Sequence, residues 1–188
     1  MNKFATLFAG LAMLVGAQDV VEFRSASRGE YRYADWAHNG NKWATDLYYI
    51  GVPGNNELSA CLGYQLKTIT PYFCGVAAKE DRELGIKTAA SIAWEKKEWK
   101  ADAYLAYFKP LRGAAEAYIT ADAVNLTRVL PKGWETGIST GFFLQGGIWN
   151  PLAGPLVRKN DRLGFWAVSY RFGPTNELRL SRVFALKR

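Results

Sequence analysis

Residues that build metal sites are scarce in this chain of 188 residues, which has one histidine and two cysteines. So few soft ligands exclude a structural zinc cluster, and no metal is expected. Also missing is any run of about 18 apolar residues, so a helix that spans a membrane is not expected. Beyond residue 17 there is no sustained 3.6-residue repeat of apolar side chains, which argues against a helical domain.

Aromatic and basic residues are what the chain has in quantity. Aromatics make up 14% of the residues, and 24 Lys plus Arg against 17 Asp plus Glu give a net charge of +7. The aromatic content is too high for a disordered chain. The basic residues form no organised stripe, so no nucleic acid is expected as a partner. No nucleotide-binding glycine motif occurs, and we expect no cofactor.

The first 17 residues have the three parts of a secretory signal peptide, in the usual order. Lys3 gives a positive start, Phe4 to Val15 an apolar stretch, and Val15-Gly16-Ala17 a small-residue cleavage motif. A short core helix would explain the apolar stretch alone. We therefore expect residues 1–17 to be a signal peptide and residues 18–188 to form one exported domain in an oxidising compartment.

The rest of the chain alternates apolar and polar residues, in runs of roughly 8 to 12 separated by turn residues. In residues 99–108, for example, Trp99 and Leu105 share an apolar face while Lys100 and Asp102 lie on the other. The pattern predicts an all-β domain of about 10 strands, with 8 to 12 as the range. An antiparallel up-and-down meander of this kind closes into a β-barrel, because closure removes the unpaired edges.

Three local expectations follow from the same pattern. Lys96-Lys97 is the predicted loop of a hairpin that pairs Trp94 with Trp99. The segment Asp19 to Ala37 is strand-like but long, with a bend or break near Gly29, and Gly146 to Arg162 is expected to be a long loop.

The direction of the apolar faces separates two kinds of barrel. In a soluble barrel they point inward, whereas in a membrane barrel they point to lipid and the lumen is polar. Export favours the membrane arrangement, and so do apolar faces that end in Trp or Tyr, as at the two membrane interfaces. The candidate girdle residues are Trp43, Tyr49, Trp94, Trp99, Tyr107 and Trp166. The candidate lumen-lining residues are Lys87, Lys100, Asp102, Glu116, Asp122 and Arg171.

In this pattern, from Asp19 to Leu186, the chain resembles the small outer-membrane β-barrel proteins of Gram-negative bacteria. The resemblance implies a porin-like protein of the bacterial outer membrane, in contact with outer-membrane lipid and lipopolysaccharide. Such families usually end on an aromatic residue, whereas Phe184 lies four residues before the end here. Arg182 falls in phase with Phe184, on the face expected to meet lipid.

Cys61 and Cys74 are the candidate disulfide. A two-residue turn at Lys67-Thr68 places the two side chains directly opposite each other, near disulfide reach. The alternative is two free cysteines that act as small apolar fillers.

Three functions stay open at this stage. The first is a non-enzymatic outer-membrane barrel with a polar, charge-lined interior, either structural or a narrow passage for small solutes. The second is a membrane-embedded enzyme acting on lipid or surface glycan, with His38 and Asp35 as the candidate acid–base pair. No serine stands in a G-x-S-x-G elbow, and a rim histidine near solvent is the simpler explanation of His38. The third is a soluble exported barrel that binds an apolar ligand inside.

Overall fold

The computed structural model describes residues 18–27, 31–52, 55–78, 83–113 and 116–187. The predicted signal peptide, residues 1–17, lies outside the described residues. In the described part, twelve antiparallel strands form one closed barrel, in which each strand pairs with its neighbours in sequence and β1 pairs with β12. A short 3-10 helix, η2 (Pro131–Gly133), joins β8 to β9. The strands are β1 (Gln18–Ala26), β2 (Tyr31–Asn39), β3 (Trp43–Val52), β4 (Asn55–Tyr64), β5 (Ile69–Ala78), β6 (Glu83–Lys96), β7 (Trp99–Arg112), β8 (Tyr118–Leu130), β9 (Trp134–Gln145), β10 (Ile148–Asp161), β11 (Gly164–Arg171) and β12 (Glu177–Lys187).

The predicted all-β meander is confirmed, and twelve strands replace the expected ten or so. One added strand comes from residues 19–37, which divide into β1 and β2. The other is β10, so the long loop expected from Gly146 to Arg162 is wrong. Pro151 and Pro155 made that segment look irregular. The backbone nitrogens of Pro151 and Pro155 point to the same side of β10 as that of Ala153, which faces β11. The N–H of Ala153 donates a hydrogen bond to Phe172, just beyond β11, and the regular pairing of β10 with β11 begins only at Leu156. Prolines are tolerated in β10 because they face a side where few ladder bonds form.

The barrel has two ends, which we call the terminal end and the far end. The terminal end contains Gln18 and Lys187, together with the turns that follow β2, β4, β6, β8 and β10. The far end contains the remaining connections between strands. An even number of strands brings both described ends of the chain to the same end of the barrel.

The β6–β7 hairpin differs from the predicted one by two residues. Trp94 pairs with Ala101, and the turn lies at Lys97-Glu98 rather than Lys96-Lys97. A shift of two residues leaves every side chain on its expected face, so the apolar pattern cannot distinguish the two registers. Lys97 adopts a positive φ of 55°, which a tight hairpin turn requires.

Strand β8 carries a bulge that strict alternation does not predict. Its register with β7 and with β9 shifts after Ala121, and Asp122 and Ala123 both line the lumen. Beyond the bulge the phase is reversed, so Val124, which unbroken alternation from Tyr118 would turn inward, is 39% exposed on the outside. Asn125 is buried in its place, because an extra residue turns the following side chains over.

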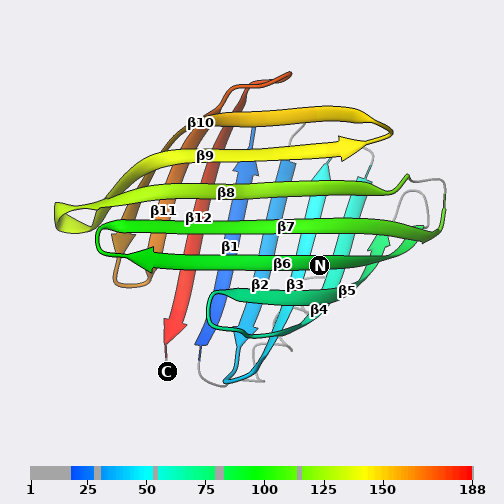
Figure 1. Ribbon diagram of the computed structural model, residues 1–188, viewed down its shortest axis with the longest axis horizontal. Coiled ribbons are helices and arrows are strands. Elements are labelled where there is room, and N and C mark those ends of the chain that lie inside the picture. The colour runs from blue at the N-terminus through cyan, green and yellow to red at the C-terminus, as the bar shows by residue number, and fades with distance from the viewer. Residues whose placement is uncertain (1–17, 28–30, 53–54, 79–82, 114–115, 188) are drawn as a thin grey trace, which may run out of the picture.

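The barrel is asymmetric and narrow. Strands β6 to β10 have 12 to 14 residues, and the other strands have 8 to 11. Figure 1 shows the long strands running across the view as one wall, while β1 to β3, β11 and β12 cross behind them. Side chains from opposite walls meet, as at Tyr48 on β3 and Tyr104 on β7, whose ring centroids are 6.4 Å apart.

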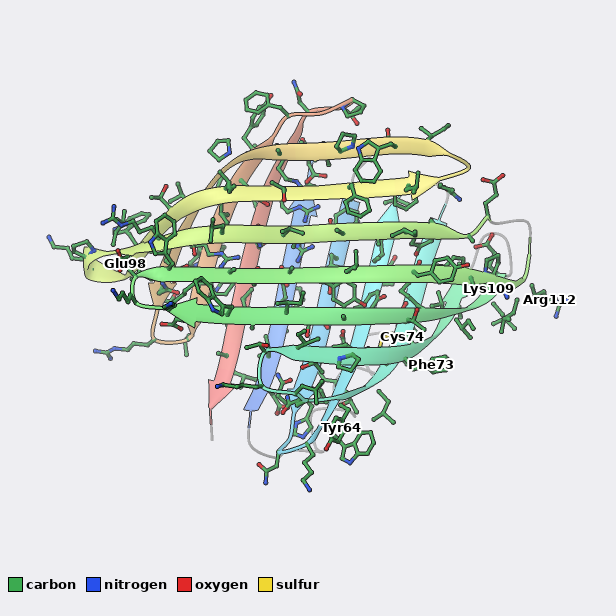
Figure 2. All side chains as sticks on the ribbon, in the orientation of Figure 1. Tyr64, Phe73, Cys74, Glu98, Lys109 and Arg112 are labelled. Carbon is green, nitrogen blue, oxygen red and sulfur yellow. A yellow bond between two sulfur atoms is a disulfide. The ribbon has the colours of Figure 1, made fainter. Side chains whose placement is uncertain are left out.

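Apolar side chains cover the outside, and charged side chains fill the inside. Leu62, Ile92 and Leu105 are exposed on the outer face, and Leu105 is 45% accessible. Lys87, by contrast, is 2% exposed. Figure 2 shows the same alternation on β5, where Phe73 points outward and Cys74, the next residue, points inward. The arrangement is the reverse of a soluble barrel. No helix in the described ranges is long and apolar enough to cross a membrane.

Candidate functional site

The lumen contains a cavity of about 1070 Å³. Asn39 and Gln65 line it near the terminal end, and Tyr31 and Glu177 line it near the far end. A cavity with wall residues from both ends is the feature that a passage requires. Its walls are strongly polar, because the inward positions of the strands carry most of the buried charge of the chain.

Three arginines narrow the lumen, and we call them and their carboxylate partners the arginine cluster. Arg24 on β1, Arg171 on β11 and Arg179 on β12 converge on Asp122 of β8. The Arg179 Nη2 to Asp122 Oδ1 distance is 2.8 Å, and Glu177 also accepts bonds from Arg171 and Arg179. Since β1 and β8 are not neighbours in the barrel, the Arg24–Asp122 pair crosses the lumen.

A second network of charges lies on β7 to β10, nearer the terminal end. Arg158 Nη1 lies 2.7 Å from Asp102 Oδ1 and 3.8 Å from Glu135 Oε2. Lys100 Nζ lies 2.9 Å from Glu135 Oε1, and Asn125 donates a hydrogen bond to Asp102. Every member of this network therefore has a partner of opposite charge or an amide donor.

Lys87 is the most buried lysine described, and it is enclosed by rings. Its Nζ lies 2.6 Å from Glu57 Oε1 and donates to the Tyr48 hydroxyl at 2.9 Å. The rings of Tyr48, Phe108 and Tyr118 lie about it, with centroids 5.1, 6.0 and 5.6 Å from Nζ. A cation held by a carboxylate and by aromatic faces remains charged in a poorly hydrated place.

Tyrosines and a disulfide form the lumen surface on β2 to β5. Cys61 on β4 and Cys74 on β5 are opposite each other with a Cα–Cα distance of 4.0 Å, and their sulfurs are bonded. Tyr48 packs against this disulfide, and Tyr33 and Tyr72 pack against the same cluster. The sequence register placed the two cysteines opposite, and the described pairing is the same.

Asp35 on β2 and Asp46 on β3 line the large cavity beside these tyrosines. Each has a buried Oδ1 without a hydrogen-bond partner, and no lysine or arginine of the described residues forms an ion pair with either. Their carboxyl groups lie within hydrogen-bonding reach of each other. Among the described residues they are the carboxylates of this cavity without an ion pair, and Glu83 on β6 is also buried without one but does not line the cavity. Sequence reasoning named Asp35 for a different role and did not name Asp46.

The structure separates the predicted lumen residues into two groups. Inward positions are occupied by Lys87, Lys100, Asp102, Asp122 and Arg171. Glu116 is different, because it precedes the first residue of β8 and is exposed near Gly146 at the far end. Its assignment to the lumen is wrong, since the alternation was extended past the end of the strand.

The outward aromatics gather near both ends. Trp43, Trp94, Trp99 and Trp166 are exposed near the terminal end, and Tyr49 and Tyr107 lie toward the far end. Sequence reasoning missed others in the same positions, namely Tyr64, Trp134, Trp149 and Phe172. Trp134 begins an alternating run and was detectable, whereas Trp149 was hidden in the expected loop.

The predicted acid–base pair of His38 and Asp35 does not form. Residues three apart on a strand face opposite sides, so Asp35 points into the lumen while His38 points outward. His38 Nδ1 lies 2.8 Å from Asp19 Oδ1, and its ring stacks on Trp36 with centroids 6.3 Å apart. Among the described residues, no group of three or more His, Cys, Asp or Glu is placed to hold a metal ion.

Solved structures share this architecture. The chain is similar to a KdgM porin, with a TM-score of 0.62 and 10% identity over 88% of this chain and 98% of that one. It is also similar to a KdgM porin in complex with disordered oligogalacturonate, with a TM-score of 0.62, 8% identity and coverage of 89% and 98%. A NanC porin gives a TM-score of 0.60, 9% identity and coverage of 89% and 98%. The sequence matches no family model and no curated protein. At these identities the likeness extends to the fold, and the side chains of the lumen have to be interpreted on their own.

Proposed function

We propose that this protein is an outer-membrane β-barrel that passes small solutes through its lumen. The observation that carries the proposal is the cavity of about 1070 Å³, which has polar walls and lining residues from both ends of the barrel. A barrel of about eight strands is filled by its own side chains, and one of 16 to 18 leaves a wide aqueous channel. Twelve strands with an arginine cluster inside correspond to a narrow passage.

The outer surface supports a place in the membrane. Leucine, isoleucine, valine and phenylalanine are exposed around the barrel, and tryptophan and tyrosine lie toward its two ends. Apolar bands between aromatic girdles are typical of outer-membrane barrels. We therefore propose lipid and lipopolysaccharide as the molecules in contact with this surface, and export by the predicted signal peptide as the route.

Conductance tests the proposal. The protein, refolded in detergent and added to a planar lipid bilayer, should give small stepwise currents. Arg24→Ala removes a side chain that crosses the lumen, so its single-channel conductance should exceed that of the native barrel. Arg182→Ala is the matched control, because Arg182 is an equally shielded arginine on the outer face.

Folding is checked separately by heat-modifiable migration in gels, which a closed barrel should show. Folded protein that inserts into bilayers and carries no current would contradict a passage. Equal conductance changes in Arg24→Ala and Arg182→Ala would show that the current does not run past the arginine cluster.

A further inference from the structure

Among the described residues, every basic side chain inside the barrel is bound to an acidic one. Arg24 Nη2, for example, lies 2.8 Å from Glu22 Oε1. The six interior basic residues of the described chain are Arg24, Lys87, Lys100, Arg158, Arg171 and Arg179. Their acidic partners are Glu22, Glu57, Asp102, Asp122, Glu135 and Glu177. These twelve residues balance one another, so this part of the interior attracts neither sign of ion strongly.

Asp35 and Asp46 stand outside this balance. Asp46 is 8% exposed. Both aspartates line the large cavity, and each has a buried Oδ1 without a hydrogen-bond partner. Apart from each other, the charged groups that act on the two aspartates are Glu22, Arg24 and Lys87. Glu22 adds negative charge, and the two cations are already bound to other carboxylates.

The mouth of the cavity does not offset these carboxylates. Lys67, in the turn after β4, lines the cavity there, but its side chain is exposed. Charges in water are screened over about 8 Å at physiological salt, whereas charges within a narrow, low-dielectric lumen act on every ion that passes. Carboxylates in a pore favour cations, and lysines and arginines favour anions.

We propose that the lumen prefers cations, and that Asp35 and Asp46 determine this preference. The inference rests on the proposed passage and names the class of solute for it, which is small cations such as K⁺ and small organic ammonium ions. The paired residues fix the width of the passage. The carboxyl groups of Asp35 and Asp46 are close enough to hold one proton between them, so together they supply a single unbalanced negative charge, which sets its sign.

The experiment measures the reversal potential in planar bilayers under a KCl gradient. The native barrel should pass K⁺ several-fold better than Cl⁻. The double variant Asp35→Asn/Asp46→Asn keeps the side-chain size and should bring the permeability ratio close to one. The matched control, Glu98→Gln/Asp161→Asn, removes two carboxylates that lie outside the cavity, and it should keep the native ratio. Figure 2 shows Glu98 at the end of the β6–β7 hairpin.

The outcomes distinguish the two proposals. A native barrel that conducts with no preference, or with a preference for Cl⁻, overturns the cation inference and leaves the passage intact. A folded barrel that conducts nothing overturns both. Because the native ratio is measured first, the test does not depend on the folding of the double variant. If the double variant folds and keeps the native ratio, Asp35 and Asp46 do not determine the selectivity.

Discussion

The two sides of the lumen accommodate buried polar groups in different ways. On β1, β8, β11 and β12, the arginine cluster matches each charge with an opposite one. On β2 to β5, the wall consists of tyrosines packed about the Cys61–Cys74 disulfide, with Asp35 and Asp46 beside them. We call the second region the tyrosine side.

The difference predicts how much stability each side should lose when one polar side chain is removed. An arginine cluster is stable only while it is complete, because the loss of one partner leaves a buried charge uncompensated. Tyrosine has an apolar ring and a single hydroxyl, so the loss of one polar group there costs one hydrogen bond. The tyrosine side therefore depends on single hydrogen bonds, and the arginine cluster depends on a complete set of ion pairs.

The largest effect is expected for Asp122→Ala, which removes the carboxylate shared by Arg24, Arg171 and Arg179. Breaking a buried ion pair costs about 3–5 kcal/mol, and we expect the lower end because Asp122 is 31% exposed. Urea unfolding in lipid vesicles, followed by tryptophan fluorescence, measures the loss. Asp161→Ala is the control, since its carboxylate faces outward. A loss no larger than that of the control would mean that the arginine cluster contributes no special stability.

Next in size is the disulfide on the tyrosine side. Cys61 and Cys74 are 13 residues apart, and closing a loop of this length stabilises the folded state by about 3 kcal/mol in the chain-entropy account, often less in practice. Cys61→Ser/Cys74→Ser should lower the free energy of unfolding by about 2 kcal/mol. Dithiothreitol should reproduce the change in the native protein and have no effect on the variant. If a thiol assay shows that the native protein has been reduced and its free energy of unfolding is unchanged, the expectation is contradicted.

The parts of this structure that alternate regularly were predictable from the sequence. The face of Leu105 and the register of Cys61 with Cys74 depend on a period of two and on one short turn, both of which are local. The β8 bulge at Asp122 broke that period, and Pro151 and Pro155 hid β10. Local pattern has no means of detecting an extra residue or the side on which a proline nitrogen lies.

Contacts across the lumen were beyond sequence reasoning for another reason. Arg24 and Asp122 are 98 residues apart, and they meet because the barrel is narrow and closed between β1 and β12. Partners that meet across the lumen follow from strand number and barrel shape, which no local pattern specifies. The Asp19–His38 pair is of another kind, because it joins neighbouring strands on the outer face and depends on where the chain turns between β1 and β2, near the break predicted at Gly29.

A smaller effect is expected for Tyr48→Phe on the tyrosine side. The change removes the hydroxyl that accepts a bond from Lys87, but Glu57 remains 2.6 Å from the ammonium group. One hydrogen bond with a charged donor is worth about 1.5 kcal/mol or less when the donor keeps its ionic partner. Unfolding in urea should show a loss of this size. Tyr170→Phe, on the outer face, is the control and should be neutral. A loss as large as that of Asp122→Ala would remove the distinction between the two sides.

The smallest effect is expected for Arg182→Ala. This substitution removes an arginine on the outer face, which can be compared with the arginines inside the lumen. Arg182 pairs with Asp161 at 2.7 Å and lies between the rings of Trp166 and Phe184, with its Cζ 4.9 and 4.4 Å from their centroids. An arginine near the membrane interface reaches water and headgroups, so neither its presence nor its loss is costly. Urea unfolding should therefore give a midpoint close to that of the native barrel. A loss of stability as large as that of Asp122→Ala would mean that an outward ion pair is as important as one that crosses the lumen. The position of the arginine cluster inside the barrel would then not explain its sensitivity.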